Sequence, residues 1–158
     1  MNKNQKTKEK TCAFYASDYH FEMISLPYIN KKLDESKEVI ILTENNLEET
    51  IKTLLSKINL NQTNKENIIK INCENNDLKK FKQIDKEMKN EKDIVLFVKG
   101  KENYIKNINK NIEKWIEKSE NVEVIDCYDI EEVSEKLDNI MNQYKTILKT
   151  TGKNVIKY

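Results

Sequence analysis

The side chains best suited to chemistry lie in two short stretches that are far apart in the chain. The first stretch, residues 11–20 (TCAFYASDYH), combines a thiol, two tyrosines, a serine, an aspartate and the only histidine of the chain. The second stretch is Asp126-Cys127-Tyr128. The candidate ligand-binding residues are Cys12, Tyr15, Ser17, Asp18, Tyr19, His20, Asp126, Cys127 and Tyr128.

Two interpretations of the first stretch stay open. In the functional one, His20 is a base or a ligand group that Asp18 orients, near the start of a helix. Tyr15 or Ser17 then donates hydrogen bonds. In the structural one, Ser17 and Asp18 cap the helix, the tyrosines pack with their hydroxyls in water, and His20 lies on the surface of the first turn.

The cysteines also have two interpretations. Cys12 or Cys127 is either a nucleophile, with His20 as its base, or a small apolar side chain of a buried strand. Together with Cys73 they are odd in number, widely spaced and without a CxxC pair, and the chain has one histidine. This pattern disfavours a disulfide framework and a zinc site, so we expect no metal and a reducing, cytoplasmic location.

The glycines exclude the common nucleotide-binding motifs. The chain has only two, Gly100 and Gly152, and neither GxxxxGK[ST] nor GxGxxG occurs. Gly152-Lys153 is followed by Asn154, and Ile147 stands where the first glycine of a P-loop belongs. We therefore expect no nucleotide cofactor, and indeed no cofactor of any kind.

Charge and hydropathy exclude further classes. The formal net charge is +1, and all 28 basic residues are lysines. Arginine provides the planar fork that most often clamps phosphate or guanine, so its absence disfavours a nucleic-acid partner. No segment approaches the ~18 apolar residues of a membrane span, and no apolar stretch of signal-peptide length follows the basic start. We expect no membrane association.

The hydrophobic patterns predict the elements that position the two stretches. Strands are expected where short apolar, β-branched or aromatic runs occur, at residues 11–16, 37–44, 66–73, 93–98 and 122–128. Helices are expected from the 3.6-residue period, at about 19–33, 46–58 and 77–90, after Gly100 to about 116, and at 129–148. Pro27 predicts a kink or a break in the first helix.

Five strands that alternate with helices predict an α/β fold. Parallel neighbours need crossover connections, which place helices on both faces of the sheet. We expect a three-layer sandwich with a mostly parallel, five-stranded, Rossmann-like sheet. Residues 1–10 are expected to be a disordered tail, 11–150 a single domain, and 151–158 a tail or an edge strand.

The parallel sheet brings the two stretches to one edge. Tyr15 and Tyr128 end different strands, and the carboxyl ends of parallel strands meet at the edge where ligands usually bind. Lys99, Thr43 and Glu44 end other strands at this edge, and we expect them to be solvated.

The beginning of the chain resembles a known family. Cys12, Phe14-Tyr15, Ser17, Pro27-Tyr28-Ile29, Asp34-Glu35 and Val39 to Leu42 follow the order seen at the start of the DcmR-like sensory domain, also called the MEDS domain. The resemblance covers about thirty residues. It implies a RecA-like or KaiC-like fold without the ATP-binding loop, and a non-enzymatic role in sensing small, hydrocarbon-like molecules in bacterial or archaeal signalling. The family has histidine where this chain has Thr11, so only His20 offers an imidazole.

Three functional hypotheses follow. The first is a small-molecule-sensing or protein-interaction domain of bacterial signalling, which binds an apolar ligand at the carboxyl edge of the sheet. Such a stand-alone sensor signals through a protein partner or through self-association. The second is a small enzyme that depends on cysteine and histidine. The third is a structural subunit of an assembly.

Overall fold

A computed structural model describes residues 10–35, 37–44, 68–72, 93–118 and 122–156 of the chain. For residues 18, 38, 68–72 and 114–118 it describes the backbone alone. The helices expected at 46–58 and 77–90, together with Cys73, lie outside the described residues, as does the expected N-terminal tail up to residue 9.

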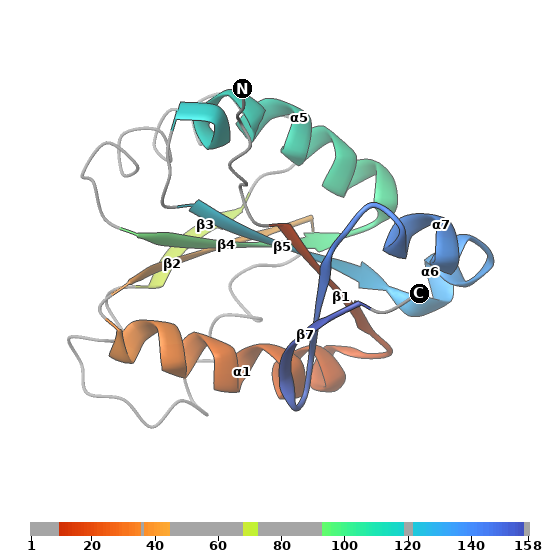
Figure 1. The fold of residues 1–158 in the computed structure, drawn as a ribbon, viewed down its shortest axis with the longest axis horizontal. Helices are drawn as coiled ribbons and strands as arrows, with labels where there is room; N and C mark the ends of the chain where they lie inside the picture. Colours follow the sequence, from red (N-terminus) through yellow and green to blue (C-terminus); the bar gives the residue numbers. More distant parts are fainter. Residues whose placement is uncertain (1–9, 36, 45–67, 73–92, 119–121, 157–158) are drawn as a thin grey trace.

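The described part of the chain is an α/β protein built on one seven-stranded, mostly parallel sheet (Figure 1). The strands are β1 (Lys10–Tyr15), β2 (Glu38–Thr43), β3 (Ile68–Asn72), β4 (Ile94–Gly100), β5 (Val122–Asp129), β6 (Thr146–Lys149) and β7 (Gly152–Val155). Their spatial order is β3-β2-β4-β5-β1-β6-β7. Every pairing is parallel except that of β6 with β7, which makes the sheet mixed.

Helices lie on both sides of the sheet (Figure 1). The described helices are α1 (Asp18–Asp34), α5 (Glu102–Lys118), the short α6 (Ile130–Val133), a 3₁₀ turn (Ser134–Lys136) and α7 (Leu137–Met141). α1 covers one face, and α5, α6 and α7 lie toward the other. α1 continues through Pro27 as one helix. Pro27 is exposed, so water can reach the backbone carbonyl that lacks its usual helical donor.

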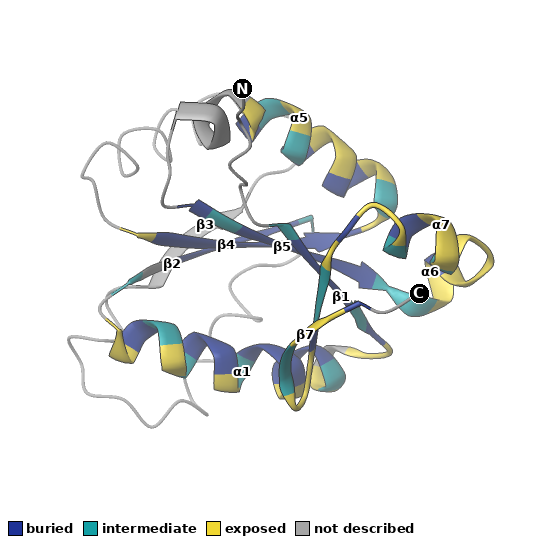
Figure 2. Cartoon of the chain, in the orientation of Figure 1, coloured by how far each residue is buried: buried dark blue, intermediate teal, exposed yellow. Residues whose placement is uncertain are grey.

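Alternation along the strands divides the core into two apolar layers. Cys12, Asp126 and Tyr128 lie on the face of α5, whereas Tyr15 and Cys127 lie on the face of α1. β4 is buried throughout its length, as expected for a central parallel strand with helices on both faces. β4 and β5 are mostly dark blue in Figure 2, whereas the β6–β7 hairpin and the outer sides of the helices carry intermediate and exposed residues.

The end of the chain differs from the sequence-based expectation. A helix was expected over residues 129–148, but helical structure ends at Met141 and residues 146–149 form β6. Tyr144 and Leu148 fit a helical period, yet they are buried in different layers of the core. A short apolar run does not distinguish helix from strand by periodicity, and here pairing with β1 determines the strand. The sheet therefore has seven strands instead of five.

The expected boundary at residue 150 falls inside the hairpin formed by β6 and β7. Within residues 151–158, where a tail or an edge strand was expected, Gly152–Val155 form the edge strand β7. Gly152 has a φ of +114°, a backbone conformation that side-chain-bearing residues rarely adopt, so glycine permits the tight reversal at this point.

Candidate functional site

The chain leaves two neighbouring strands, β1 and β5, in opposite directions. From β1 it passes through α1 to β2, which lies beyond β5 and β4 in the sheet. From β5 it passes through α6 and α7 to β6, on the other side of β1. In open α/β sheets, ligands usually bind in a crevice outside the carboxyl ends of the strands at such a reversal. Tyr15 pairs with Asp129 at this end of the strands.

Ser17 and His20 close the turn between β1 and α1. Ser17 is the N-cap, and its Oγ accepts a hydrogen bond of 3.1 Å from the backbone N–H of His20. The His20 Nδ1 accepts a hydrogen bond of 2.9 Å from the backbone N–H of Ala16. Because Nδ1 is an acceptor, the proton of the neutral ring is on Nε2. Both side chains therefore have a structural role, and Asp18 is described only by its backbone.

Tyr15 belongs to a small cluster around a buried ammonium group. The Lys99 Nζ lies 4.9 Å from the ring centroid of Tyr15 and 5.3 Å from that of Phe21. The rings of Tyr15 and Phe21 meet edge to face, with centroids 5.9 Å apart. The expectation that Lys99 and Thr43 are solvated was wrong, since their residue exposures are only 9% and 2%. Attraction between the ammonium and the faces of the rings offsets part of the cost of burial.

After the carboxyl end of β4, backbone N–H groups donate hydrogen bonds to carboxylates of the chain itself. The Glu44 Oε1 accepts a hydrogen bond of 2.9 Å from the backbone N–H of Lys101, and Glu132 accepts one of 3.1 Å from that of Glu102. A Cβ on Gly100 would lie 2.6 Å from Tyr104 Cδ2, so this position needs glycine for close packing. The start of α5 is therefore occupied by the protein's own carboxylates.

Glu102 ties α5 to the segment that follows β5. Its carboxylate accepts a hydrogen bond of 2.9 Å from Lys136 and forms a second ion pair with Lys106 at 3.4 Å. The hydrogen bond from Lys136 is the main reason that the pKa of Glu102 is lowered.

The first turn of α1 presents an aromatic side chain to solvent at the same edge of the sheet, because Tyr19 is 64% exposed.

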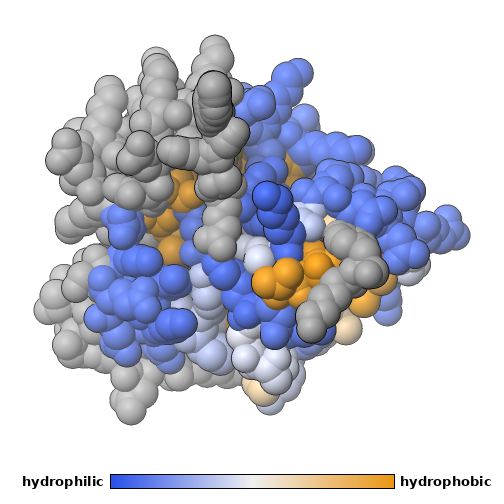
Figure 3. Space-filling view, in the orientation of Figure 1, coloured by the Kyte–Doolittle hydropathy of each residue, from blue (hydrophilic) through white to orange (hydrophobic). Residues whose placement is uncertain are grey.

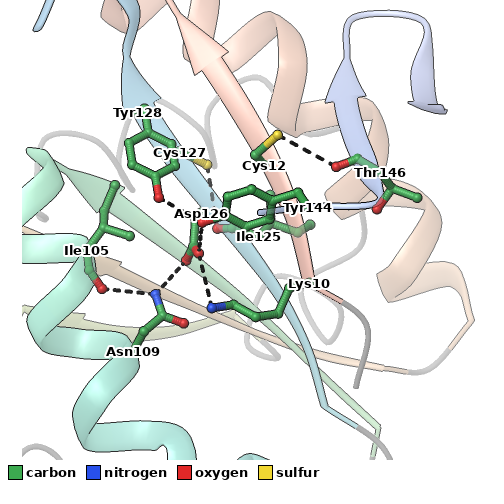
Figure 4. Close-up of polar contacts among 10 residues, drawn as sticks. All are labelled: Lys10, Cys12, Ile105, Asn109, Ile125, Asp126, Cys127, Tyr128, Tyr144 and Thr146. Atoms are coloured by element: carbon green, nitrogen blue, oxygen red, sulfur yellow. Dashed lines mark hydrogen bonds and ion pairs between the residues drawn. The ribbon is translucent and has the colours of Figure 1, made fainter. Parts of the chain in front are cut away.

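The second stretch builds a different cluster, deep in the sheet (Figure 4). Asp126 is fully buried, and its Oδ2 accepts a hydrogen bond of 2.6 Å from the Tyr144 hydroxyl. Its Oδ1 accepts one of 2.9 Å from Asn109 Nδ2, and the Lys10 ammonium lies 3.8 Å from Oδ2. The hydroxyls of Tyr144 and Tyr128 are 2.7 Å apart. Burial is the main cause that raises the pKa of Asp126, and Lys10, Tyr144 and Asn109 oppose it.

The sheet therefore divides the residues that the sequence suggested as one site. Cys12, Asp126 and Tyr128 lie on the α5 face, while Tyr15 and Cys127 lie on the α1 face. Ser17, Tyr19 and His20 lie at the start of α1. The Cys12 Sγ donates to the backbone carbonyl of Thr146, whereas His20 contacts Ala16, so no hydrogen bond joins this thiol to this imidazole among the described residues. Period-two alternation in neighbouring strands is the reason.

Both described thiols are buried and protonated. Burial is the main cause that raises the pKa of Cys12 to about 12, and burial also strongly raises that of Cys127. Asp126 adds to both shifts by electrostatic repulsion. Because the thiolate is the nucleophile, neither side chain is activated.

We expect Cys12 and Cys127 of the folded chain to react with iodoacetamide at pH 8 at least about a hundredfold more slowly than in the unfolded chain, because both the thiolate fraction and access are reduced. Peptide mass spectrometry of the alkylated protein measures each cysteine separately. The unfolded chain in urea is the control. Comparable rates in the two states would contradict the buried placement.

Reasoning from sequence missed four residues of these clusters. Lys10, Asn109 and Tyr144 complete the Asp126 cluster, and Lys99 completes the Tyr15 cluster. The sequence gives one indication that Asn109 has a role in the core: it is a polar residue one position after the buried Ile108 on an otherwise apolar helix face. Tyr144 falls within the helix expected at 129–148, but it is buried in the segment between α7 and β6.

Several site types receive no support from the described residues. None of the helices among them is both long and apolar enough to cross a membrane. Within the same residues, no three histidine, cysteine or acidic side chains lie close enough together to hold a metal ion. Comparison of the chain with protein-family models, with curated proteins and with solved structures gave no match.

Proposed function

We propose that the chain is a small-molecule-sensing or protein-interaction domain without catalytic activity, and that it binds its ligand outside the carboxyl ends of β1 and β5. The observation that carries this proposal is the reversal of chain direction between these two neighbouring strands. The role in bacterial signalling and the kinship with the DcmR-like sensory domain, with its three-layer, Rossmann-like or RecA-like architecture, belong to the same proposal.

The side chains around this crevice favour binding over catalysis. His20 contributes its Nδ1 to a backbone hydrogen bond, and the thiols of Cys12 and Cys127 are buried and protonated. A nucleophile needs an activating base within hydrogen-bond reach, and neither thiol has such a contact among the described side chains. The enzyme hypothesis is therefore the weaker one.

The same side chains indicate the chemistry of the ligand. The exposed ring of Tyr19 at the first turn of α1 offers an apolar contact with a polar end. At the carboxyl ends of β1 and β4, the rings of Tyr15 and Phe21 lie next to the Lys99 ammonium. This combination suits a small, mostly apolar molecule. Most of the described surface in the view of Figure 3 is hydrophilic, and apolar colour appears at the centre right and, between grey atoms, at the left. Val155 on β7 is 69% exposed.

A library of small apolar and aromatic molecules, screened by NMR against the ¹⁵N-labelled full chain, tests the proposal. We expect binders to shift the backbone signals of residues 15–20 and 128–131, with little change at the amino ends of β4 and β5. Tyr19→Ala is expected to weaken a binder about tenfold, because it removes an exposed aromatic contact.

Met23→Ala is the matched control, because Met23 is exposed on α1 one turn further from the crevice. Equal losses in the two variants, or shifts confined to the amino ends of the strands, would overturn the proposed location.

A further inference from the structure

Asp126 connects four segments of the fold through one carboxylate. It lies on β5, and its contacts come from Lys10 on β1, Asn109 on α5 and Tyr144 in the segment between α7 and β6. Asp126 itself is fully buried, whereas the side chain of Lys10 is 40% exposed. The cluster therefore joins an interior acid to a cation with access to water (Figure 4).

The hydrogen bonds of this cluster are compatible with two charge states of Asp126. When it is ionised, Tyr144 donates to Oδ2 and Tyr128 donates to Tyr144, over distances of 2.6 and 2.7 Å. When it is protonated on Oδ2, the carboxyl donates to the Tyr144 oxygen, and Tyr144 donates to Tyr128. The geometry of the tyrosine pair allows either hydroxyl to be the donor.

Protonation leaves the rest of the cluster satisfied. Asn109 Nδ2 donates to Oδ1 in both states and also donates to the backbone carbonyl of Ile105 at 2.9 Å. Only the Lys10 ammonium, 3.8 Å from Oδ2, loses its opposite charge. Loss of an ion pair with a half-exposed lysine costs little, since water can solvate the ammonium.

We propose that Asp126 is a proton switch in the core: uptake of one proton reverses the hydrogen bonds along Asp126, Tyr144 and Tyr128 and releases Lys10 at the amino end of β1. The proton comes from solvent and is retained on the carboxyl group, so no other group changes its charge. The switch links the charge of the Asp126 carboxyl group to the position of Lys10, the first residue of β1, independently of any ligand at the carboxyl ends of β1 and β5.

The other ionisable groups near the cluster keep their charge. Cys12 on β1, Tyr128 on β5 and Tyr144 before β6 all have a raised pKa, mainly because of burial, and stay neutral. Glu102 on α5 acts electrostatically on Tyr128, and its own pKa is lowered by Lys136, so it stays ionised. Asp126 is therefore the group in this cluster that changes its charge as the pH falls from neutrality.

The sign of the linked stability follows from the raised pKa of Asp126. The folded state holds the proton more tightly than the unfolded state, so this contribution to stability is fully present below the ordinary aspartate pKa of about 3.9. It is lost as the pH rises through the folded pKa of Asp126. In Asp126→Asn the amide mimics the neutral acid, and this pH dependence disappears.

NMR of the ¹³C,¹⁵N-labelled full chain, titrated between pH 4 and pH 8, tests the switch. We expect the side-chain carboxyl carbon of Asp126 to titrate with a midpoint above the ordinary aspartate value of about 3.9, and the Lys10 signals to follow the same midpoint. Lys10→Met should move the midpoint up by about one pH unit, because it removes the cation that favours the ionised form. Lys149→Met, at an exposed lysine on β6, is the matched control and should leave the midpoint in place.

Asp126→Asn gives an independent readout. At pH 7 its Lys10 and Tyr128 signals should match those of the wild-type chain at the acid end of the titration. A wild-type midpoint at or below the ordinary value would overturn the proposal. So would a midpoint that Lys10→Met and Lys149→Met shift equally, or Lys10 signals that do not follow Asp126. The wild-type titration decides the question even if a variant does not fold.

Discussion

Replacing Phe97 with alanine is expected to lower the free energy of unfolding by about 3–5 kcal/mol, the cost of deleting a buried phenylalanine. Phe97 is fully buried at the centre of β4, where its ring meets those of Phe21 and Tyr28 edge to face at 6.5 and 6.4 Å. The alanine variant removes the buried ring area and both aromatic contacts, and the strands on either side of β4 limit collapse of the resulting cavity.

Chemical denaturation monitored by circular dichroism measures this loss. Phe97→Leu retains most of the volume and is expected to lose less than half as much stability as Phe97→Ala. Tyr19→Ala is the surface control, with an expected change within about 0.5 kcal/mol, because the ring is exposed. If Phe97→Ala were as stable as Tyr19→Ala, Phe97 would not be packed in the core.

Replacing Tyr144 with alanine is expected to cost about 3–5 kcal/mol and to loosen the β6–β7 hairpin selectively. The hairpin joins the sheet through only two residue pairs of β1 and β6, Thr11 with Thr146 and Cys12 with Ile147. Tyr144 reinforces this short seam, because its hydroxyl donates to Asp126 on β5 and its ring packs edge to face on Tyr128 at 6.3 Å. The variant loses both contacts and leaves a cavity.

Tyr144→Phe separates the hydroxyl from the ring and is expected to cost about 1–3 kcal/mol, because Asp126 loses a charge-assisted donor. Hydrogen exchange of the β6 amides should accelerate more than that of the β4 amides in both variants. Equal acceleration in β4 and β6 would show that the hairpin does not open separately from the sheet.

A second contact holds the hairpin from the opposite face. Glu123 on β5 accepts hydrogen bonds from Tyr28 on α1 at 2.5 Å and from Lys153 on β7 at 3.1 Å. Two carboxylates of β5, Asp126 on one face and Glu123 on the other, thus fix the C-terminal hairpin across β1. This arrangement compensates for the small number of strand pairs between β1 and β6.

The main strands were predictable because their signals are local. The uninterrupted run Ile94 to Val98 and the mostly β-branched run Val39 to Leu42 are typical of strands with helices on both faces, and both became interior strands of the sheet. The period of α1 and α5 and the Ser17 cap were equally local. The C-terminal hairpin was not predictable, because pairing with β1, more than a hundred residues away, decides between helix and strand.

The candidate residues were predicted by type, but their grouping was not. The sequence predicted strands at Cys12, Tyr15, Asp126 and Tyr128. Which of the residues on one strand share a face also follows from the sequence, because side chains alternate along a strand. What it did not contain was the register between β1 and β5, which sets Cys12 opposite Asp126 and Tyr15 opposite Asp129. Alternation along β1 places Cys12 and Tyr15 on opposite faces, and the register places Asp126 on the face of Cys12, so one expected site became two clusters.

The sequence by itself determined an α/β fold and the absence of glycine-rich nucleotide loops, because each depends on residues close together in the chain. The tertiary structure alone decided that Tyr144 reaches Asp126, that Lys99 lies beneath two aromatic rings, and that the chain reverses direction between β1 and β5. These features depend on strand order and burial, which arise from the balance of contacts over the whole chain and from no single segment of it.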